Sequence, residues 1–129
     1  MRHDLLSDAL SQIKNAENSA KSDVVLRPTS KMIRSVLKIM HDKGYLGEIE
    51  YIDDGKGGKI KLELLGKINN TGAVRPRFKV GVVDFEKFEK RYLPARGFGF
   101  LMVSTSKGIM THLECRKKNV GGVLLAFVY

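Results

Sequence analysis

Three hydroxyl residues, Ser104, Thr105 and Ser106, stand side by side in the chain, and Lys107 and Gly108 follow them directly. Serine and threonine hydroxyls both donate and accept hydrogen bonds, and their short side chains lose little entropy when they are held in place. A lysine attracts phosphate, and a glycine lets the backbone come close to a ligand. This combination suits contact with phosphates, 2′-hydroxyls and exposed base edges of folded RNA. The alternative is a strand end followed by a turn.

Catalysis fits the residues of this region less well. His112 and Cys115 are three residues apart, so they would share a helix face as a Cys–His pair. Nothing in the sequence orients the histidine, and the inner face of a helix must pack, so a packed, unreactive thiol is favoured. Ser104 and Ser106 lack the Gly-x-Ser-x-Gly turn that exposes a serine nucleophile. We therefore predict that the protein is not an enzyme.

Patterns for metals and cofactors are weak. Asp53 and Asp54 are adjacent, so their carboxylates point in different directions in an extended chain, and the other ligands of a calcium site are missing. One cysteine and three histidines do not give the spacing of a zinc site. Phosphate-loop and dinucleotide fingerprints are absent. We expect no metal and no cofactor, and we assign the two aspartates to a turn.

Charge divides the chain into two unequal halves. The whole chain has 23 Lys and Arg against 14 Asp and Glu, a net charge of +9. Residues 1–65 hold 11 basic and 10 acidic side chains, whereas residues 66–129 hold 12 basic and 4 acidic ones. A folded half with this excess of cations is typical of a surface that binds nucleic acid. A merely soluble basic surface is the alternative.

The remaining composition indicates a soluble, cytoplasmic protein. Cys115 is the single cysteine, which excludes an internal disulfide and suits a reducing compartment. No apolar stretch approaches the roughly 20 residues that span a bilayer. The first residues do not resemble a secretory signal. We expect no membrane partner.

Hydrophobic periodicity predicts an N-terminal α+β lobe over residues 1–66, in the order helix, strand, helix, strand, strand. Asp4 is expected to cap a first helix that ends near residue 18. After a short strand over residues 24–26, Thr29 or Ser30 is expected to cap the second helix. Residues 46–52 and 59–65 alternate between polar and apolar around a glycine-rich turn, which predicts a β-hairpin.

Three cations, Lys31, Arg34 and Lys38, fall together on one side of the second predicted helix. The apolar stripe of that helix lies on another side, as its spacing requires. A solvated face is the favoured interpretation of these cations, and contact with phosphate is the alternative.

Residues 67–129 are expected to form a C-terminal lobe that is mostly β with a short helix. We predict irregular or strand-like chain over residues 78–92 and a central strand over residues 98–103. Thr111-x-x-Glu114 is a capping box, so a short helix should begin there. The apolar run 123–129 should be a strand that is covered on both faces or paired at the centre of a sheet. The predicted fold class is α+β, built from two small lobes.

Several segments resemble the universal small-subunit ribosomal protein family number eight. They are the run 104–111, the pair Gly121-Gly122 and the terminal Leu-Ala-Phe-Val-Tyr. The segment 27–31, Arg-Pro-Thr-Ser-Lys, resembles the family's Pro-x-Ser-Lys entry to its second helix. Residues 75–78 and 93–96 are similar to the archaeal and eukaryotic branch. The resemblance covers nearly the whole chain.

The resemblance implies a structural protein that binds the central domain of small-subunit rRNA directly and stabilises the platform of the small ribosomal subunit during assembly. It implies neighbouring ribosomal proteins as further partners and no small-molecule substrate. Matched to the family and supplemented by nearby cations, the expected rRNA-binding residues are Ser104, Thr105, Ser106, Lys107, Gly108, Gly121, Gly122, Arg96, Arg75, Arg77, Ser30 and Lys31.

One position departs from the family pattern. Bacterial members usually carry Glu after the paired glycines, whereas this chain has Val123. Any hydrogen bond that such a Glu would supply to the site is therefore missing here. Two other functions stay open as alternatives, an RNA-processing enzyme and a basic protein-interaction module.

Overall fold

The computed structural model describes the chain except for residues 1–4, 27–29, 54, 56–57, 76 and 96. The chain divides into two compact units, residues 1–68 and 69–129. Each unit combines helices with an antiparallel sheet, so the predicted α+β class is confirmed. The predicted division into an N-terminal lobe over residues 1–66 and a basic, rRNA-binding C-terminal lobe over residues 67–129 stays a prediction.

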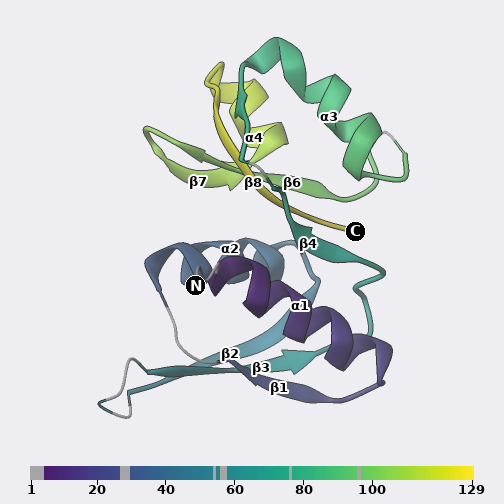
Figure 1. Ribbon diagram of the computed structural model, residues 1–129, viewed down its shortest axis with the longest axis vertical. Helices are drawn as coiled ribbons and strands as arrows, with labels where there is room; N and C mark the ends of the chain where they lie inside the picture. The colour runs from purple at the N-terminus through teal and green to yellow at the C-terminus, as the bar shows by residue number, and fades with distance from the viewer. Residues whose placement is uncertain (1–4, 27–29, 54, 56–57, 76, 96) are drawn as a thin grey trace. The chain divides into compact units, whose positions relative to one another are not determined.

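The N-terminal unit has the predicted element order. It contains α1 (Leu5–Asn18), β1 (Asp23–Leu26), α2 (Lys31–Asp42), β2 (Leu46–Ile52) and β3 (Lys59–Leu64). The strands form an antiparallel sheet in the order β1-β3-β2. Both helices lie on the same face of this sheet (Figure 1). The opposite face is therefore left open within this unit.

Local sequence explains both ends of α2. The Ser30 hydroxyl accepts a hydrogen bond from the Ile33 amide at 3.3 Å, which caps the first turn as expected. At the other end, Gly44 follows the last turn with a φ of +84°, a conformation that glycine adopts without strain. The predicted caps Asp4 and Thr29 lie outside the described residues.

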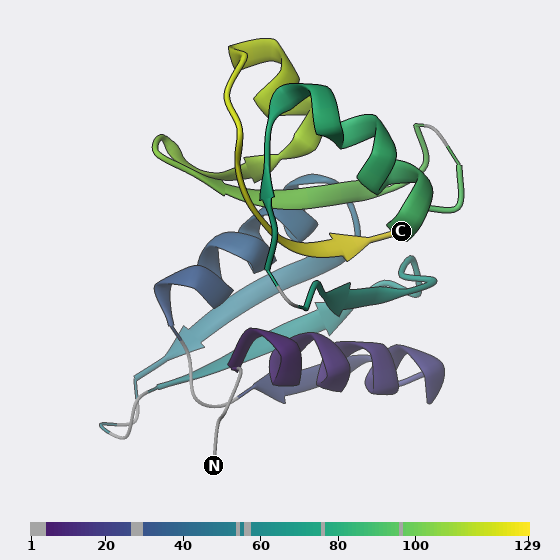
Figure 2. The same cartoon turned by 45° about the horizontal axis from the view of Figure 1, so that its top comes forward.

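The C-terminal unit is built around its last strand. Its elements are β4 (Thr71–Ala73), β5 (Lys79–Val80), the 3₁₀ turn η1 (Val82–Asp84), α3 (Phe85–Tyr92), β6 (Phe100–Thr105), β7 (Gly108–Thr111), α4 (His112–Lys118) and β8 (Gly122–Val128). The sheet has the order β4-β8-β6-β7, and β5 also pairs with β8. The apolar strand β8 is thus paired along both edges, as its sequence predicted (Figure 2).

The expectation for residues 78–92 was wrong over its second half. Only Lys79 and Val80 are in a strand, whereas residues 85–92 form α3. Phe85 and Phe88 are three residues apart, so they share one helix face, and both are buried. Aromatic residues have weak helix propensity, so it is this tertiary burial that stabilises the helix.

A single apolar cluster joins α3 and α4 to one face of the C-terminal sheet. Its buried members are Val74, Val80, Phe85, Phe88, Leu93, Leu101, Val103, Met110, Cys115 and Leu124. Because side chains alternate along a strand, the neighbours of these sheet residues point away from the cluster. The face of the C-terminal sheet opposite α3 and α4 is therefore formed by the residues that alternate with the cluster residues along each strand.

Candidate nucleic-acid interface

The hydroxyl segment, residues 104–108, forms the tip of a tight hairpin between β6 and β7. Thr105 pairs with Gly108 across the turn. The Thr105 hydroxyl donates to the Gly108 carbonyl at 2.7 Å and accepts from the Lys107 amide at 3.0 Å. Gly108 has a φ of +110°, which an L side chain rarely adopts. The Thr105 hydroxyl is therefore engaged in shaping the turn, and Gly108 is required by its backbone angle.

The turn leaves the other polar groups of the segment at the surface. Ser106 and Lys107 are exposed, and Ser104 is half-buried. These side chains belong to the C-terminal unit, whose sequence has 11 basic and 4 acidic residues. The tip therefore offers a hydroxyl and an ammonium group together to solvent.

A row of four paired residues runs across the sheet from the base of this tip. Ser104 pairs with Ile109 on β7 and with Val123 on β8, and Val123 pairs with Lys79 on β5. Residues directly opposite each other in antiparallel strands project from the same face. All four are half-buried or exposed, and they lie on the face opposite the α3–α4 cluster.

Lys79 lies in this row and was not among the residues predicted from the sequence. In Arg77-Phe78-Lys79-Val80 the apolar residues pack against the α3–α4 cluster, so the alternation was a usable signal for two cations on the other face. The predicted residues Arg75 and Arg77 are exposed just before β5. Arg96 lies outside the described residues. Val123, noted as a departure from the family, occupies the middle of the row.

The paired glycines allow close approach between strands of the protein itself. A Cβ atom on Gly122 would lie 2.1 Å from the Ser104 carbonyl oxygen, and one on Gly121 would lie 2.5 Å from the Val80 carbonyl oxygen. Neither space admits a side chain without moving backbone. The two glycines thus set the distances from β8 to β5 and β6, and Gly122 fixes the backbone that carries Ser104.

The predicted N-terminal residues occupy the start of α2. Lys31 is exposed, whereas the Ser30 hydroxyl is the helix cap already described. Ser30 and Lys31 belong to the N-terminal unit, whereas the hairpin belongs to the C-terminal unit.

Behind the sheet, a buried carboxylate links α3 to α4. Glu89 contacts the Arg116 guanidinium, and its Oε1 lies 3.5 Å from His112 Nε2. His112 Nδ1 also accepts a hydrogen bond from the Leu101 amide at 3.1 Å, so the neutral ring carries its proton on Nε2, toward Glu89. Burial lowers the pKa of His112, and the nearby Glu89 charge only partly opposes this. Arg116 thus has a partner inside the unit.

The four carboxylates of the C-terminal unit are all engaged within it. Besides Glu89, Asp84 accepts from the Gly81 amide at 3.1 Å, Glu86 lies 3.9 Å from Lys90, and Glu114 accepts from the Thr111 hydroxyl at 3.3 Å. None of these contacts involves Lys79 or Lys107. The exposed side chains of Lys79 and Lys107 therefore meet solvent, and the row itself contains no carboxylate.

Comparison with known proteins shows the family of the chain. The family model described as ribosomal protein S8 matches residues 4–129. The chain belongs to the ribosomal protein S8 family. It is 52% identical over 126 residues to the small ribosomal subunit protein uS8 of the archaeon Methanococcoides burtonii, a match that covers 98% of this chain and 97% of that relative. The family and the archaeal-type similarity are the ones that the sequence motifs indicated.

Membership of the ribosomal protein S8 family fits the chemistry of the remaining polar residues. Burial raises the pKa of the Cys115 thiol, which makes it a poor nucleophile. Asp53 Oδ1 accepts from the Gly55 amide at 3.0 Å, as expected of a turn residue, and Asp54 lies outside the described residues. Among the described residues, no three His, Cys, Asp or Glu side chains gather to hold a metal ion.

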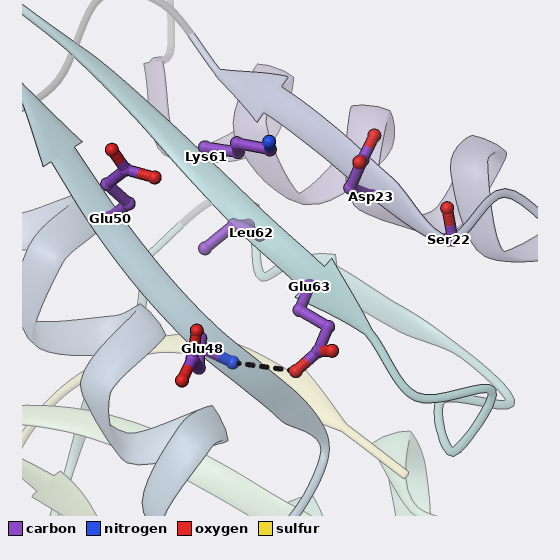
Figure 3. A pocket seen from close by; sticks show the side chains of 7 residues that line it. All are labelled: Ser22, Asp23, Glu48, Glu50, Lys61, Leu62 and Glu63. Carbon is purple, nitrogen blue, oxygen red and sulfur yellow. Dashed lines mark hydrogen bonds between the residues drawn. The ribbon is translucent and has the colours of Figure 1, made fainter.

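The open face of the N-terminal sheet has the opposite chemistry. A hollow of about 290 Å³ there is lined by Ser22, Asp23, Glu48, Glu50, Lys61, Leu62 and Glu63. Figure 3 shows the carboxylates of Asp23, Glu48, Glu50 and Glu63 around the single ammonium of Lys61. Glu63 also accepts from the Glu48 amide at 3.1 Å. This face of the S8-family chain repels phosphate, so it is a poor surface for RNA.

Proposed function

We propose that the chain is a structural, non-catalytic constituent of the small ribosomal subunit in the cytoplasm. It binds the central domain of small-subunit rRNA directly and stabilises the platform during assembly. Neighbouring small-subunit ribosomal proteins are its further partners. The observation that carries the proposal is the β6–β7 tip, where Ser106 and Lys107 are exposed at the end of a sheet whose adjoining row bears a further lysine, Lys79.

The mechanism is selective binding of one RNA conformer. A protein that contacts one arrangement of a flexible RNA more favourably than the others shifts the population toward that arrangement. Ser106 and Ser104 supply short hydrogen-bonding groups for phosphates or 2′-hydroxyls, and Lys107 and Lys79 supply attraction to the backbone. Ile109 and Val123 give the row an apolar surface for a sugar or base. No step of this mechanism requires turnover.

The glycines and Thr105 act indirectly in this proposal. Gly108 and the Thr105 hydroxyl hold the turn, while Gly121 and Gly122 hold the strands at the spacing that positions Ser104. Arg75, Arg77 and Arg96 are proposed to contact phosphates beside the row, and Lys31 to contact rRNA from the N-terminal unit. Ser30 acts by fixing the start of the helix that carries Lys31.

Binding of the full chain to a panel of transcribed rRNA fragments, measured over a range of salt concentrations, tests the proposal. We expect one central-domain fragment to bind well above the others, with an affinity that falls steeply as salt rises. Equal affinity for all fragments would contradict specific recognition. Clean cleavage of the fragment would favour an RNA-processing enzyme, and binding to acidic proteins without RNA would favour a protein-interaction module.

A further inference from the structure

An exposed tyrosine in the N-terminal unit carries an arginine over its ring. Tyr51 on β2 is 48% exposed, and the Arg34 guanidinium carbon on α2 lies 5.1 Å from its ring centroid. Tyr51 pairs with the fully buried Ile60, so it projects from the helix-covered face of the sheet. Arg34 holds the ring by a cation–π contact. The result is a fixed aromatic platform at the end of the sheet.

A hollow of about 260 Å³ opens beside this platform. It is lined by Arg34, Tyr51, Ile52, Asp53 and Gly58. One wall is therefore aromatic, one is cationic and one carries a carboxylate. The carboxylate disfavours phosphate inside the hollow, but it accepts hydrogen bonds from the N–H groups of a base edge. A flat, uncharged ring with adjacent donors is the ligand that satisfies all three walls.

Cations continue along α2 from this hollow. Lys31, Arg34 and Lys38 are exposed and spaced by three and four residues, so they share one side of the helix. A chain of phosphates can follow such a stripe while one base turns into the hollow. This arrangement of a cationic track with an aromatic platform is the general chemistry of single-stranded nucleic-acid binding.

We propose that Arg34, Tyr51 and Asp53 form a binding site for one unpaired nucleotide of RNA, with guanosine preferred. The base stacks on Tyr51, its N1–H and N2–H groups donate to the Asp53 carboxylate, and its flanking phosphates meet Lys31 and Lys38. Asp53 already accepts from the Gly55 amide through Oδ1, which holds the carboxylate in position. The site rests on the proposed function, because it assigns a nucleotide contact to a protein that binds rRNA.

The test uses the full chain and labelled hexaribonucleotides, all uridine or with one central guanosine or adenosine, followed by fluorescence anisotropy. We expect the guanosine hexamer to bind most tightly. Tyr51→Leu should weaken it by about 5- to 150-fold, the equivalent of the 1–3 kcal/mol measured for base stacking. Tyr51→Phe should keep most of the affinity, and Asp53→Asn should remove the preference for guanosine over adenosine.

Matched controls separate binding from folding. Val25→Ala changes an exposed apolar residue on the other face of the same sheet, and it should leave hexamer affinity unchanged. Arg34→Gln keeps the Tyr51 side chain but removes the cation that holds it and lines the hollow, so it should weaken binding even if Tyr51→Leu fails to fold. Wild-type affinity in Arg34→Gln, or in a folded Tyr51→Leu, would overturn the proposal. So would equal affinity for the three hexamers, or Tyr51-dependent binding of polyglutamate in place of RNA.

Failure of this site is distinguishable from failure of the rRNA function. If Tyr51 variants bind every hexamer like the wild type while Lys79→Glu still weakens the central-domain fragment, only the nucleotide site is wrong. If the wild type binds the guanosine hexamer through Tyr51 but binds all rRNA fragments equally, the site stands and the specific rRNA function fails.

Discussion

The hairpin row of the C-terminal sheet and the open face of the N-terminal sheet have similar frameworks and opposite chemistry. Both are cross-strand arrangements on antiparallel sheets whose other face packs a hydrophobic core. The first presents Ser104 and Lys79 beside the exposed tip, whereas the second presents four carboxylates around Lys61. The net charge of +9 is therefore not spread evenly over the surface of the chain.

This contrast means that the fold of an antiparallel sheet does not by itself decide the charge of its open face. Each strand contributes every second side chain to a face, so a few substitutions at alternate positions set the sign of that face. In the C-terminal unit the carboxylates are engaged in caps and in the Glu86–Lys90 and Glu89–Arg116 pairs. In the N-terminal unit four carboxylates line an open hollow. Substitutions that exchange or remove these features test the difference.

Breaking the spacing behind the hairpin row has the largest expected effect. Gly122→Ala places a Cβ atom 2.1 Å from the Ser104 carbonyl oxygen, so β6 and β8 must move apart. We expect a loss of about 2–3 kcal/mol in the free energy of unfolding, measured with urea. Gly81→Ala is the matched control, because its Cβ would meet only Asp84 Oδ2 at an ordinary 3.6 Å. Equal stability of the two variants would show that the close approach is unimportant.

Exchanging charge between the two faces tests the comparison itself. Lys79→Glu should weaken binding to the central-domain fragment by about 2 kcal/mol. The substitution removes an attraction to phosphate of about 1 kcal/mol and adds a repulsion of about 1 kcal/mol in water. The salt slope should fall by about 1. Glu50→Lys adds a cation to the acidic face and should leave the affinity for the central-domain fragment unchanged. A similar response to both substitutions would mean that only total charge matters.

Removing a single hydroxyl has a smaller expected effect. Ser106→Ala should weaken binding to the central-domain fragment by roughly 1–2 kcal/mol, as loss of one hydrogen bond at a polar interface does. Ser22→Ala removes an exposed hydroxyl that lines the acidic hollow, so it serves as the control and should bind like the wild type. Unchanged affinity of a folded Ser106→Ala variant would argue against the tip as the contact.

The smallest expected effect is a pH dependence of the free energy of unfolding that comes from His112, which is buried behind the sheet. Burial lowers the pKa of His112 in the folded state, so the unfolded chain binds a proton more readily. The contribution of His112 to stability is therefore complete above the unfolded pKa of about 6.5 and declines as pH falls toward the lower folded value. His112→Asn keeps an acceptor for the Leu101 amide and does not titrate. Between pH 7 and pH 5 the free energy of unfolding should therefore fall less in this variant than in the wild type, as measured by urea unfolding curves at both pH values.

Local patterns predicted most of the N-terminal unit. The apolar stripe of α1, the Ser30 cap and the β2–β3 hairpin depend on residues close in sequence, so periodicity and turn chemistry were sufficient. The C-terminal unit depends partly on distant pairing, because β4 and β5 pair with β8 across about 40 to 60 residues of sequence. Strand β7 is paired locally, but it has only four residues, and Met110 packs into the cluster opposite Val103. Such a strand leaves almost no periodic signal.

Site prediction had the same limit. The hydroxyl segment was found from residue types alone, but the internal role of Thr105 required the geometry of the turn. Glu89 and Arg116 are 27 residues apart, so the sequence could not show that this arginine is paired. Gly121 and Gly122 were predicted as rRNA-binding residues, which stays a prediction, and their close approach to the Val80 and Ser104 carbonyls required the strand geometry. Lys79 was visible in the alternation of residues 77–80 and was overlooked.

Tethered cleavage of the bound RNA tests the central claim most directly. Ser106→Cys and Glu50→Cys each introduce an exposed thiol, and native Cys115 is fully buried, so an iron chelate attaches selectively to the new cysteine. In the binary complex with the central-domain fragment, we predict strong local cleavage from position 106 and little from position 50. Strong cleavage from position 50 with none from position 106 would contradict the assignment of the hydroxyl tip as the RNA-binding face.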